Sequence, residues 1–350
     1  MIFENVTIES IAYEAPPIVL SSNDLEGRLS SVYERLGLPF GRLELMTGIK
    51  ERRLWNDATR PSDGATLAGA KALRASEVKA DTLGALIMCS VCKDFLEPAT
   101  ACVVHDNLNV SSNALVFDMS NACLGVLSGM MVTATMIENG VIDSALLVAG
   151  ENSGPLLETT INTILHDNEI TRQTIKPYFA SLTIGSGAVA VLLSRSSARN
   201  VGKPKLVAAS HLAATNHNDL CRGNSDTGML DGAEVLMNTD SETLMLRGVE
   251  TAARTWTAFK AESGWGNDDP DLFCTHQVGA AHRKLLYESL GLDLSKDYST
   301  LESFGNTGSV SCPMTLAMAL ENKDFKQGSK VALLGIGSGI NCAVMGVEWV

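Results

Sequence analysis

The chain has 350 residues, of which 45% are hydrophobic and 30 are glycines, a composition typical of a globular enzyme with a sizeable core. Its 27 basic residues are outnumbered by 40 acidic residues, so the formal net charge is -13. A chain this acidic is repelled by the phosphate backbone of nucleic acids and by an anionic membrane surface, so neither is expected as a partner.

The N-terminal segment has the wrong charge for a secretory signal. Its sequence is MIFENVTIES, with Glu4 where a signal peptide has basic residues, and no apolar run of the chain is long enough to span a bilayer. We therefore expect a cytoplasmic protein with no integral membrane segment. Its eight cysteines should be mostly reduced thiols rather than a disulfide framework.

Two cysteines with a metal-like spacing follow the first helical segment, DGATLAGAKALRAS (63–76). The segment LIMCSVC (86–92) is typical of a buried strand that runs into a loop, and Cys89 and Cys92 in it form a C-x-x-C pair. No second pair follows, so buried packing is favoured over metal binding or redox chemistry. We expect no metal site and no cofactor.

A third cysteine, Cys123, stands where an apolar run gives way to small residues. ALVFD (114–118) predicts a short buried strand, and LGVLSGMMVTATMIENG (124–140) predicts a helix that ends at Asn139-Gly140. Cys123 is thus expected at a helix N-terminus, where unpaired amides and the helix dipole favour the nucleophilic thiolate. Free cysteines are also among the most buried residues, so this segment alone leaves a nucleophile and an inert core thiol equally open.

The second half of the chain repeats the first. GALIMCSV (84–91) resembles PDLFCTHQ (270–277), and SALLVAGENSG (144–154) resembles VALLGIGSGIN (331–341). Apolar strands alternate with helical segments such as CPMTLAMALEN (312–322), which predicts a layered α/β fold with mainly buried sheets, built from duplicated βα halves.

A polar segment, SSARNVGKP (196–204), separates the halves, so we expect an N-terminal half over 1–198 and a C-terminal half over 199–350. The polar stretch 151–180 has no equally long counterpart in the second half. It is expected to form a cap or a subunit contact.

The duplication suggests where the partners of a cysteine nucleophile lie. His276 follows a strand equivalent to the one that ends near Cys89, and Asn306 lies in a glycine-rich turn before a helix, in the region equivalent to Cys123. Pseudo-symmetric halves would bring these residues together. A hydrogen-bonded core role stays open for His276, and it is the expected role of His282, one turn along a helix.

The turn GIGSG (335–339) fits neither a nucleophile elbow nor a dinucleotide fingerprint, because Ile336 and Ile340 stand where those motifs need glycine. Such a turn can present backbone N–H groups to a developing oxyanion, with Ser338 at its centre. An ordinary turn is equally open.

Together these segments resemble the thiolase superfamily, specifically the β-ketoacyl-ACP synthase III branch of condensing enzymes. The motifs are TGIKERRLW (47–55), NACLG (121–125), THQVGAAH (275–282), GNTGSVSCP (305–313) and LLGIGSG (333–339). The resemblance covers nearly the whole chain and implies a five-layered αβαβα fold and a homodimer. It also implies that Cys123 is the acylated nucleophile, that His276 and Asn306 support the second half-reaction, and that the amides of Cys123 and Ser338 hold the acyl oxygen.

Within this branch, the segment DFLEPATA (94–101) is similar to the OleA-type thiolases of bacterial long-chain olefin biosynthesis. The short-chain primer enzymes have an aromatic residue at the position of Glu97. A carboxylate beside an acyl tunnel can have its pKa raised and serve as the base that removes an α-proton. The resemblance implies that the loop around Glu97 crosses to the partner subunit.

The implied activity is a non-decarboxylative Claisen condensation of two long-chain acyl-CoA molecules, giving a 2-alkyl-3-oxoacyl product as a thioester or a free β-keto acid for olefin or ketone biosynthesis. Enzymes downstream in that pathway are possible partners. Two alternatives stay open. The chain could be a malonyl-ACP-dependent β-ketoacyl-ACP synthase III, or a catalytically silent thiolase-like subunit that stabilises a partner.

Overall fold

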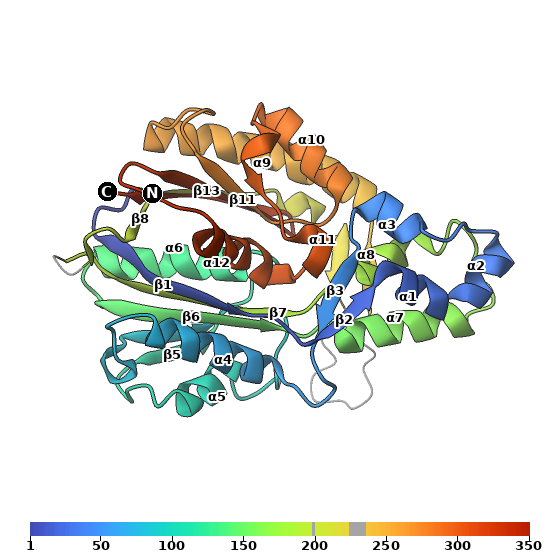
Figure 1. Cartoon of the computed structure of the whole chain (residues 1–350), viewed down its shortest axis with the longest axis horizontal. Coiled ribbons are helices and arrows are strands. Elements are labelled where there is room, and N and C mark those ends of the chain that lie inside the picture. The colour runs from blue at the N-terminus through green and yellow to red at the C-terminus, as the bar shows by residue number, and fades with distance from the viewer. Residues whose placement is uncertain (198–199, 224–235) are drawn as a thin grey trace.

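A computed structural model describes residues 1–197, 200–223 and 236–350, and a large sheet unites both halves of the chain (Figure 1). In these residues the sheet has ten strands. The N-terminal half supplies, from the outer edge inward, β5 (Leu115–Asp118), β4 (Ala85–Met88), β6 (Ser144–Glu151), β7 (Gly187–Arg195) and β1 (Val6–Glu14). The C-terminal half supplies β12 (Asp297–Tyr298), β11 (Leu272–Thr275), β13 (Lys330–Gly337), β14 (Asn341–Trp349) and β8 (Pro204–Ala213).

The two halves have the same topology. In each, the second strand pairs in parallel with the first and third, and the remaining pairings are antiparallel. β4 and β11, β6 and β13, and β7 and β14 are therefore equivalent, as the repeated segments predict. The halves meet where Thr7 of β1 pairs with Lys205 of β8. The predicted boundary at 198/199 falls on residues outside the described part of the chain, so it stays a prediction.

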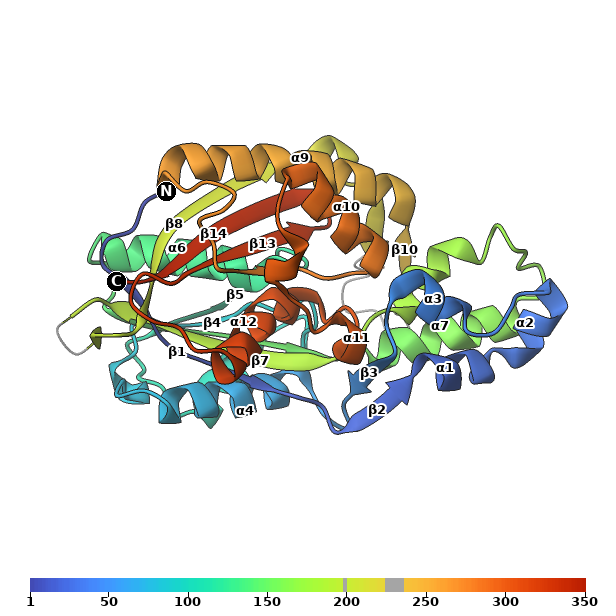
Figure 2. The same ribbon diagram turned by 45° about the horizontal axis from the view of Figure 1, so that its top comes forward.

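The helices complete five layers, and the predicted αβαβα arrangement is confirmed (Figure 1). Two helices, α6 (Gly125–Glu138) and α12 (Ser311–Asn322), lie between the halves of the sheet, and each contacts strands of both. The N-terminal half is covered on its outer face by α4 (Pro61–Arg74) and α5 (Thr100–Asn107). The C-terminal half is covered by α9 (Ser241–Ser263), with α10 (Ala280–Leu290) beside it (Figure 2).

The sequence of each helix fits its layer. In α12 apolar and small residues are buried around most of the helix, and α6 buries Val126, Met130, Ala134 and Ile137, as expected for helices enclosed on both sides. In α4 the buried face is made of Ala65, Ala68, Gly69 and Ala72, small residues that let the helix approach the sheet closely.

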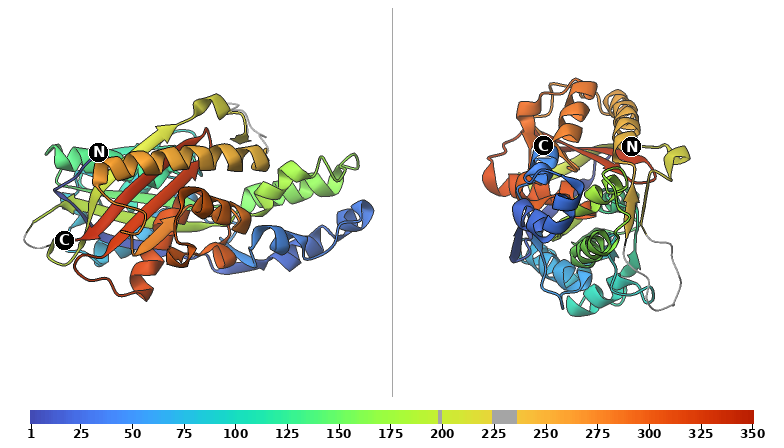
Figure 3. Two further views of the ribbon diagram at one scale, coloured as in Figure 1. Left: turned by 90° about the horizontal axis from the view of Figure 1, so that it is seen from above. Right: turned by 90° about the vertical axis from the view of Figure 1, so that its right-hand side faces the viewer.

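A lobe projects from the end of the body opposite the two chain termini (Figure 3). It contains β2 (Ile18–Ser21), α1 (Ser22–Arg28), α2 (Ser30–Leu36), α3 (Arg42–Thr47), β3 (Glu51–Leu54), α7 (Gly154–His166), η2 (Lys176–Tyr178) and α8 (Phe179–Leu182). Leu25, Leu29 and Tyr33 pack there against Leu157 and Ile161 in a separate apolar core. Most of the excursion 151–180 lies in this lobe, and its role as a cap or a subunit contact stays a prediction.

The remaining described elements are short. They are η1 (Ala80–Thr82), η4 (Thr215–His217), β9 (Cys221–Gly223), β10 (Met237–Thr239), η5 (Leu294–Lys296), α11 (Leu301–Phe304) and η6 (Gly308–Val310). Across the residues that the structure describes, no helix is both long and apolar enough to cross a membrane.

Candidate active site

Cys123 lies between β5 and α6, as the sequence predicts. The helix begins at Gly125, after a tight turn in which Ala122 has a φ of 46°. A positive φ is uncommon for a residue with a side chain, and it marks a turn that its surroundings hold in a strained conformation. The turn places Cys123 at the N-terminal end of a helix of the middle layer.

The protonation state of the Cys123 thiol differs from the prediction. Burial, with a smaller effect of the nearby Glu151 charge, raises the pKa of Cys123 to about 12. The expectation that the helix N-terminus favours a thiolate is therefore wrong for the resting enzyme, because desolvation outweighs it. The nucleophile waits as a neutral thiol, and its proton must leave during the attack on the substrate.

The turn that carries Ser338 packs directly against the Cys123 loop. A Cβ atom on Gly337 would lie 3.5 Å from the backbone nitrogen of Leu124. The side chain of Asn341 spans the same two segments, with its Nδ2 3.3 Å from the carbonyl oxygen of Ser338 and 3.4 Å from Oδ1 of Asn121. The structure thus brings the Ser338 turn to the nucleophile loop.

His276 follows β11 and is buried, with 4% of its surface exposed. Its backbone N–H donates to the carbonyl of Leu334, 2.8 Å away, and no described group hydrogen-bonds to its Nδ1. Burial lowers the pKa of His276 to about 3, with a smaller contribution from the neighbouring His282 in the same direction. The imidazole is therefore neutral near pH 7, the form that can accept one proton while donating another.

His282, on α10, is buried as predicted for a core residue. The expected role is that of a hydrogen-bonded core residue, but Nδ1 of His282 has no hydrogen-bond partner among the described residues. Burial lowers the pKa of His282 to about 4, so this ring is also neutral.

Asn306 lies in the turn between α11 and η6, and this turn is hydrogen-bonded to the N-terminal half of the chain. The N–H of Asn306 donates to the carbonyl of Thr183, 3.0 Å away, and its own carbonyl accepts from Gly185, 2.8 Å away. Gly305 has a φ of 65°, and a Cβ there would lie 2.6 Å from the Thr183 oxygen, so this position requires glycine. Asn306 is buried, and its Oδ1 accepts from Gly308 N–H at 3.0 Å.

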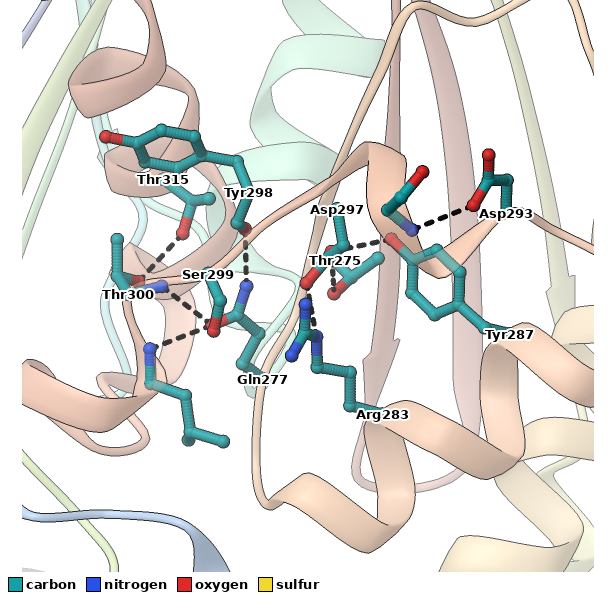
Figure 4. Close-up of polar contacts among 12 residues, drawn as sticks. Thr275, Gln277, Arg283, Tyr287, Asp293, Asp297, Tyr298, Ser299, Thr300 and Thr315 are labelled. Carbon is teal, nitrogen blue, oxygen red and sulfur yellow. Dashed lines mark hydrogen bonds and ion pairs between the residues drawn. The ribbon is translucent and has the colours of Figure 1, made fainter. Parts of the chain in front are cut away.

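A polar network around Gln277, the residue after His276, was not foreseen from the sequence (Figure 4). The buried amide of Gln277 accepts hydrogen bonds from Ser299, Thr300 and Leu301 and donates one to the carbonyl of Tyr298, with distances between 2.8 and 3.0 Å. Gln277 thereby fixes the start of α11, the helix that leads to Asn306. It connects the backbone at His276 to the segment that positions Asn306.

A second part of this network lies behind Thr275 (Figure 4). Asp297 accepts hydrogen bonds from Arg283 and from Tyr287, which is 2.6 Å away, and its Oδ1 is 3.5 Å from Thr275 Oγ1. Burial raises the pKa of Asp297, although each of these partners opposes that rise. The network fixes α10, and with it His282, against the end of β11.

Glu97 lies apart from the other candidates. Its loop is exposed, and among the described residues no hydrogen bond or ion pair joins Glu97 to Cys123, His276 or Asn306. The neighbouring Phe95 and Leu96 are 38% and 57% exposed, so two large apolar side chains flank Glu97 on the surface. Within one chain, packing and hydrogen bonds join the segments around Cys123, His276, Asn306 and Ser338, whereas Glu97 is exposed and makes no such bond to them.

Comparison with known proteins gives the same assignment over the whole chain. Residues 117–210 match the family model of 3-oxoacyl-[acyl-carrier-protein] synthase III, and residues 261–349 match the model of its C-terminal part. An acyl-CoA:acyl-CoA alkyltransferase of Shewanella oneidensis is 42% identical, with 100% of each chain covered. A β-ketoacyl-[acyl-carrier-protein] synthase III of Clostridium tetani is 25% identical, with 99% of each chain covered.

The structural comparison agrees. One similar structure is that of a cysteine-to-serine variant of Xanthomonas campestris OleA with bound lauric acid and lauroyl-CoA. It superposes on this chain with a TM-score of 0.92 at 37% sequence identity, and the superposition covers 99% of this chain and 100% of that one. Other structures of that protein carry replacements of a glutamate or a histidine. The chain thus belongs to the thiolase-fold condensing enzymes of the ketosynthase III branch, in the family of acyl-CoA:acyl-CoA alkyltransferases.

Proposed function

We propose that this protein joins two long-chain acyl-CoA molecules by a non-decarboxylative Claisen condensation and releases one coenzyme A. The observation that carries the proposal is the match to acyl-CoA:acyl-CoA alkyltransferases over the full length of the chain. It is supported by contacts between the segments that follow Cys123, His276 and Asn306. The lauroyl-CoA bound to Xanthomonas campestris OleA supports the substrate class. The product is a 2-alkyl-3-oxoacyl thioester or the β-keto acid derived from it.

In the first half-reaction, the sulfur of Cys123 attacks the carbonyl carbon of one acyl-CoA. The carbon–sulfur bond to coenzyme A breaks, and the proton of the Cys123 thiol ends on the departing coenzyme A sulfur. The backbone amides of Cys123 and Ser338 would stabilise the oxyanion of the tetrahedral intermediate. We assign to His276 the transfer of the thiol proton to the departing coenzyme A sulfur.

In the second half-reaction, a carboxylate base removes an α-proton from the second acyl-CoA, and we assign this role to Glu97. The resulting enolate carbon attacks the acyl-Cys123 carbonyl, a carbon–carbon bond forms, and the Cys123 sulfur leaves and regains a proton. Hydrogen bonds from His276 and Asn306 would stabilise the enolate oxygen of the second thioester. The replaced cysteine, glutamate and histidine in the Xanthomonas campestris structures are the same residue types.

A homodimer would bring Glu97 to the active site of the partner. Exposed apolar side chains support such an interface on this face: besides Phe95 and Leu96, the edge strand β5 exposes Leu115 and Val116, which are 47% and 37% exposed. An exposed apolar edge strand is a natural site for pairing with a second copy. We further propose that the dimer acts in the cytoplasm and passes its product to downstream enzymes.

The runner-up is a malonyl-ACP-dependent synthase III, favoured by the names of the matching family models and by relatives such as the Clostridium tetani protein. That enzyme forms its carbanion by decarboxylation and needs no base at position 97. A silent partner subunit is disfavoured because Cys123, His276 and Asn306 are all present, with His276 and Asn306 buried and Cys123 partly exposed.

The test is a single-turnover experiment with labelled myristoyl-CoA as the sole substrate. Wild-type protein should form an acyl-enzyme on Cys123 and then a condensed product that mass spectrometry detects without malonyl thioester. Glu97→Gln should still be acylated but should lose condensation by about a hundredfold or more, the usual effect of removing a general base. Glu169→Gln, at an exposed glutamate of the lobe, is the matched control and should behave as wild type.

A requirement for malonyl thioester, or condensation by Glu97→Gln at nearly the wild-type rate, would make the synthase III alternative the better assignment. Protein that is never acylated by labelled acyl-CoA would favour the silent subunit.

A further inference from the structure

A buried glutamate that the sequence did not single out connects the segments of the candidate site. Glu151 is the last residue of β6, and only 4% of its surface is exposed. Its backbone is fixed on both sides, because its carbonyl accepts a hydrogen bond from Trp55 Nε1 at 3.0 Å and it pairs with Gly187 of β7. The side chain therefore starts from a rigid position in the centre of the molecule.

The carboxylate of Glu151 binds two segments that are distant in sequence. Val91 N–H donates to Oε1 at 2.9 Å, and Cys92 N–H donates to Oε2 at 3.0 Å, so the carboxylate holds the root of the loop that carries Glu97. The hydroxyl of Ser309 donates to Oε1 from the other side. Ser309 lies three residues after Asn306, in the short helix η6 that leads into α12.

Close packing supports these hydrogen bonds. Gly308 has a φ of 58°, and a Cβ atom there would lie 3.5 Å from the carboxyl carbon of Glu151, so the Asn306 turn rests on the carboxylate. A Cβ atom on Gly125, two residues after Cys123, would lie 3.5 Å from Cβ of Ser309. The starts of α6 and η6 and the root of the Glu97 loop therefore meet around Glu151.

The charge of Glu151 has no cation to balance it, since no lysine, arginine or histidine among the described residues forms an ion pair with it. A buried carboxylate of this kind is stabilised by its backbone and hydroxyl donors alone. The negative charge of Glu151 also raises the pKa of Cys123, and the nearby Cys221 raises it as well. The carboxylate thus opposes nucleophile ionisation, which indicates that its contribution to the site is geometric.

We propose that Glu151 is a positioning residue of the condensing site, whose carboxylate fixes the root of the Glu97 loop to the segment that carries Asn306. This inference rests on the proposed function, in which Glu97 and Asn306 both act on the second acyl-CoA. If the Glu97 loop of one protomer reaches the active site of its partner, Glu151 fixes the root of that loop to the active site of the protomer to which both belong. The spacing between the two sites of the dimer is then set in part by this carboxylate.

The experiment separates position from charge with two variants. Glu151→Gln removes the charge and places an N–H₂ group against amides that need an acceptor, whereas Glu151→Asp keeps the charge but cannot reach all three donors. Both should lose condensation of myristoyl-CoA by about a hundredfold, the usual cost of misplacing catalytic groups by about 1 Å. Acylation of Cys123 should fall much less in both, because that half-reaction needs neither Glu97 nor its loop.

Alkylation of Cys123 by iodoacetamide at a fixed pH gives the second readout, located by peptide mass spectrometry. Loss of the neighbouring negative charge in Glu151→Gln should increase the thiolate fraction and speed alkylation by up to about tenfold, while Glu151→Asp should react at nearly the wild-type rate. A general loosening of the structure would speed both variants equally. Glu9→Gln is the control for a buried carboxylate away from the site: Glu9 bonds to Ser194 and Asn200 and pairs with Lys203, but touches neither loop.

Ser309→Ala removes one donor and leaves the charge in place, so it carries the test if Glu151→Gln does not fold. It should lower condensation several-fold and leave alkylation unchanged. Condensation within about threefold of wild type in both Glu151→Gln and Ser309→Ala would overturn the inference. Wild-type protein that makes no product from myristoyl-CoA would instead refute the proposed function, and with it the inference that rests on it.

Discussion

Gly125 lies against Cys89: a Cβ atom on Gly125 would come within 2.0 Å of the Cys89 carbonyl oxygen. Cys89 follows β4, and Gly125 begins α6, so the helix that follows the nucleophile is packed directly onto the end of a central strand. A contact this short leaves no room for any side chain. The position of Cys123 therefore depends on a glycine two residues later in the chain.

Gly125→Ala should displace the start of α6 and move Cys123 away from the Ser338 turn. We expect acylation to fall by about a hundredfold, because oxyanion stabilisation depends on atomic placement. The free energy of unfolding should fall by about 1–3 kcal/mol, as for other overpacked sites. Gly27→Ala is the control: Gly27 lies in α1, a Cβ atom there would have no neighbour within 4 Å, and that variant should be as stable as wild type or more so. Unchanged acylation in Gly125→Ala would contradict the argument.

The raised pKa of Cys123 predicts how its alkylation depends on pH. Only the thiolate reacts, so below a pKa of about 12 the rate should rise about tenfold for each pH unit, throughout the neutral range. A thiolate stabilised by the helix dipole would react at a rate that is nearly independent of pH. Iodoacetamide labelling of Cys123, with the exposed Cys102 as an internal reference, measures this slope. A flat profile would show that the helix N-terminus outweighs burial after all.

The sequence predicts those features of the fold and site that depend on local pattern. The strand before Cys123 and the helix after it are visible as a change from larger apolar residues to small ones, and the Asn139-Gly140 stop matches the end of α6. The expectation that this strand is buried is wrong, because β5 lies at the edge of the sheet with Leu115 and Val116 exposed. The duplication is visible because equivalent strands, such as β6 and β13, have similar apolar runs. The glycines of the Ser338 turn are conspicuous in sequence, and they prove necessary where Gly337 packs on Leu124.

Features that depend on distant contacts could not be predicted in this way. The protonation state of Cys123 is set by burial between layers from both halves of the chain. Glu151 looks like an ordinary polar residue at the end of a strand, because its donors Val91 and Ser309 lie 60 residues before it and 158 residues after it. Gln277 likewise gains its role only when the segment around Thr300 folds back onto it.

The buried histidines predict a loss of stability in mild acid. The pKa of His282 is about 4 in the folded state and near its ordinary value of 6.5 when unfolded, so between these values the unfolded chain binds a proton that the folded chain does not. Stability is therefore intact above about pH 6.5 and falls as the pH is lowered, by about 2 kcal/mol at about pH 5 for this one group. His276, with a pKa of about 3, acts in the same direction.

His282→Gln removes this titration, so its Tm should fall less than that of wild type between neutral and mildly acidic pH. The measurement is thermal unfolding across that range. His166→Gln is the control, because His166 is exposed on α7 and its loss should leave the pH dependence unchanged. Equal pH dependence in His282→Gln and wild type would mean that His282 is protonated in the folded protein.

Sharing of active sites between subunits can be tested by mixing two inactive variants. Cys123→Ala lacks the nucleophile and Glu97→Gln lacks the base, so in a heterodimer one site would combine the intact Cys123 of one protomer with the intact Glu97 of the other. Random exchange of subunits in a two-fold dimer should then restore about a quarter of the wild-type condensation activity. Cys123→Ala mixed with His276→Ala is the matched control, because we expect both residues to serve the site of their own chain, so no mixed dimer would contain an intact site. Absence of restored activity in confirmed heterodimers, or monomeric sedimentation at assay concentrations, would place Glu97 outside the partner's site and remove the structural reason for its role as the base.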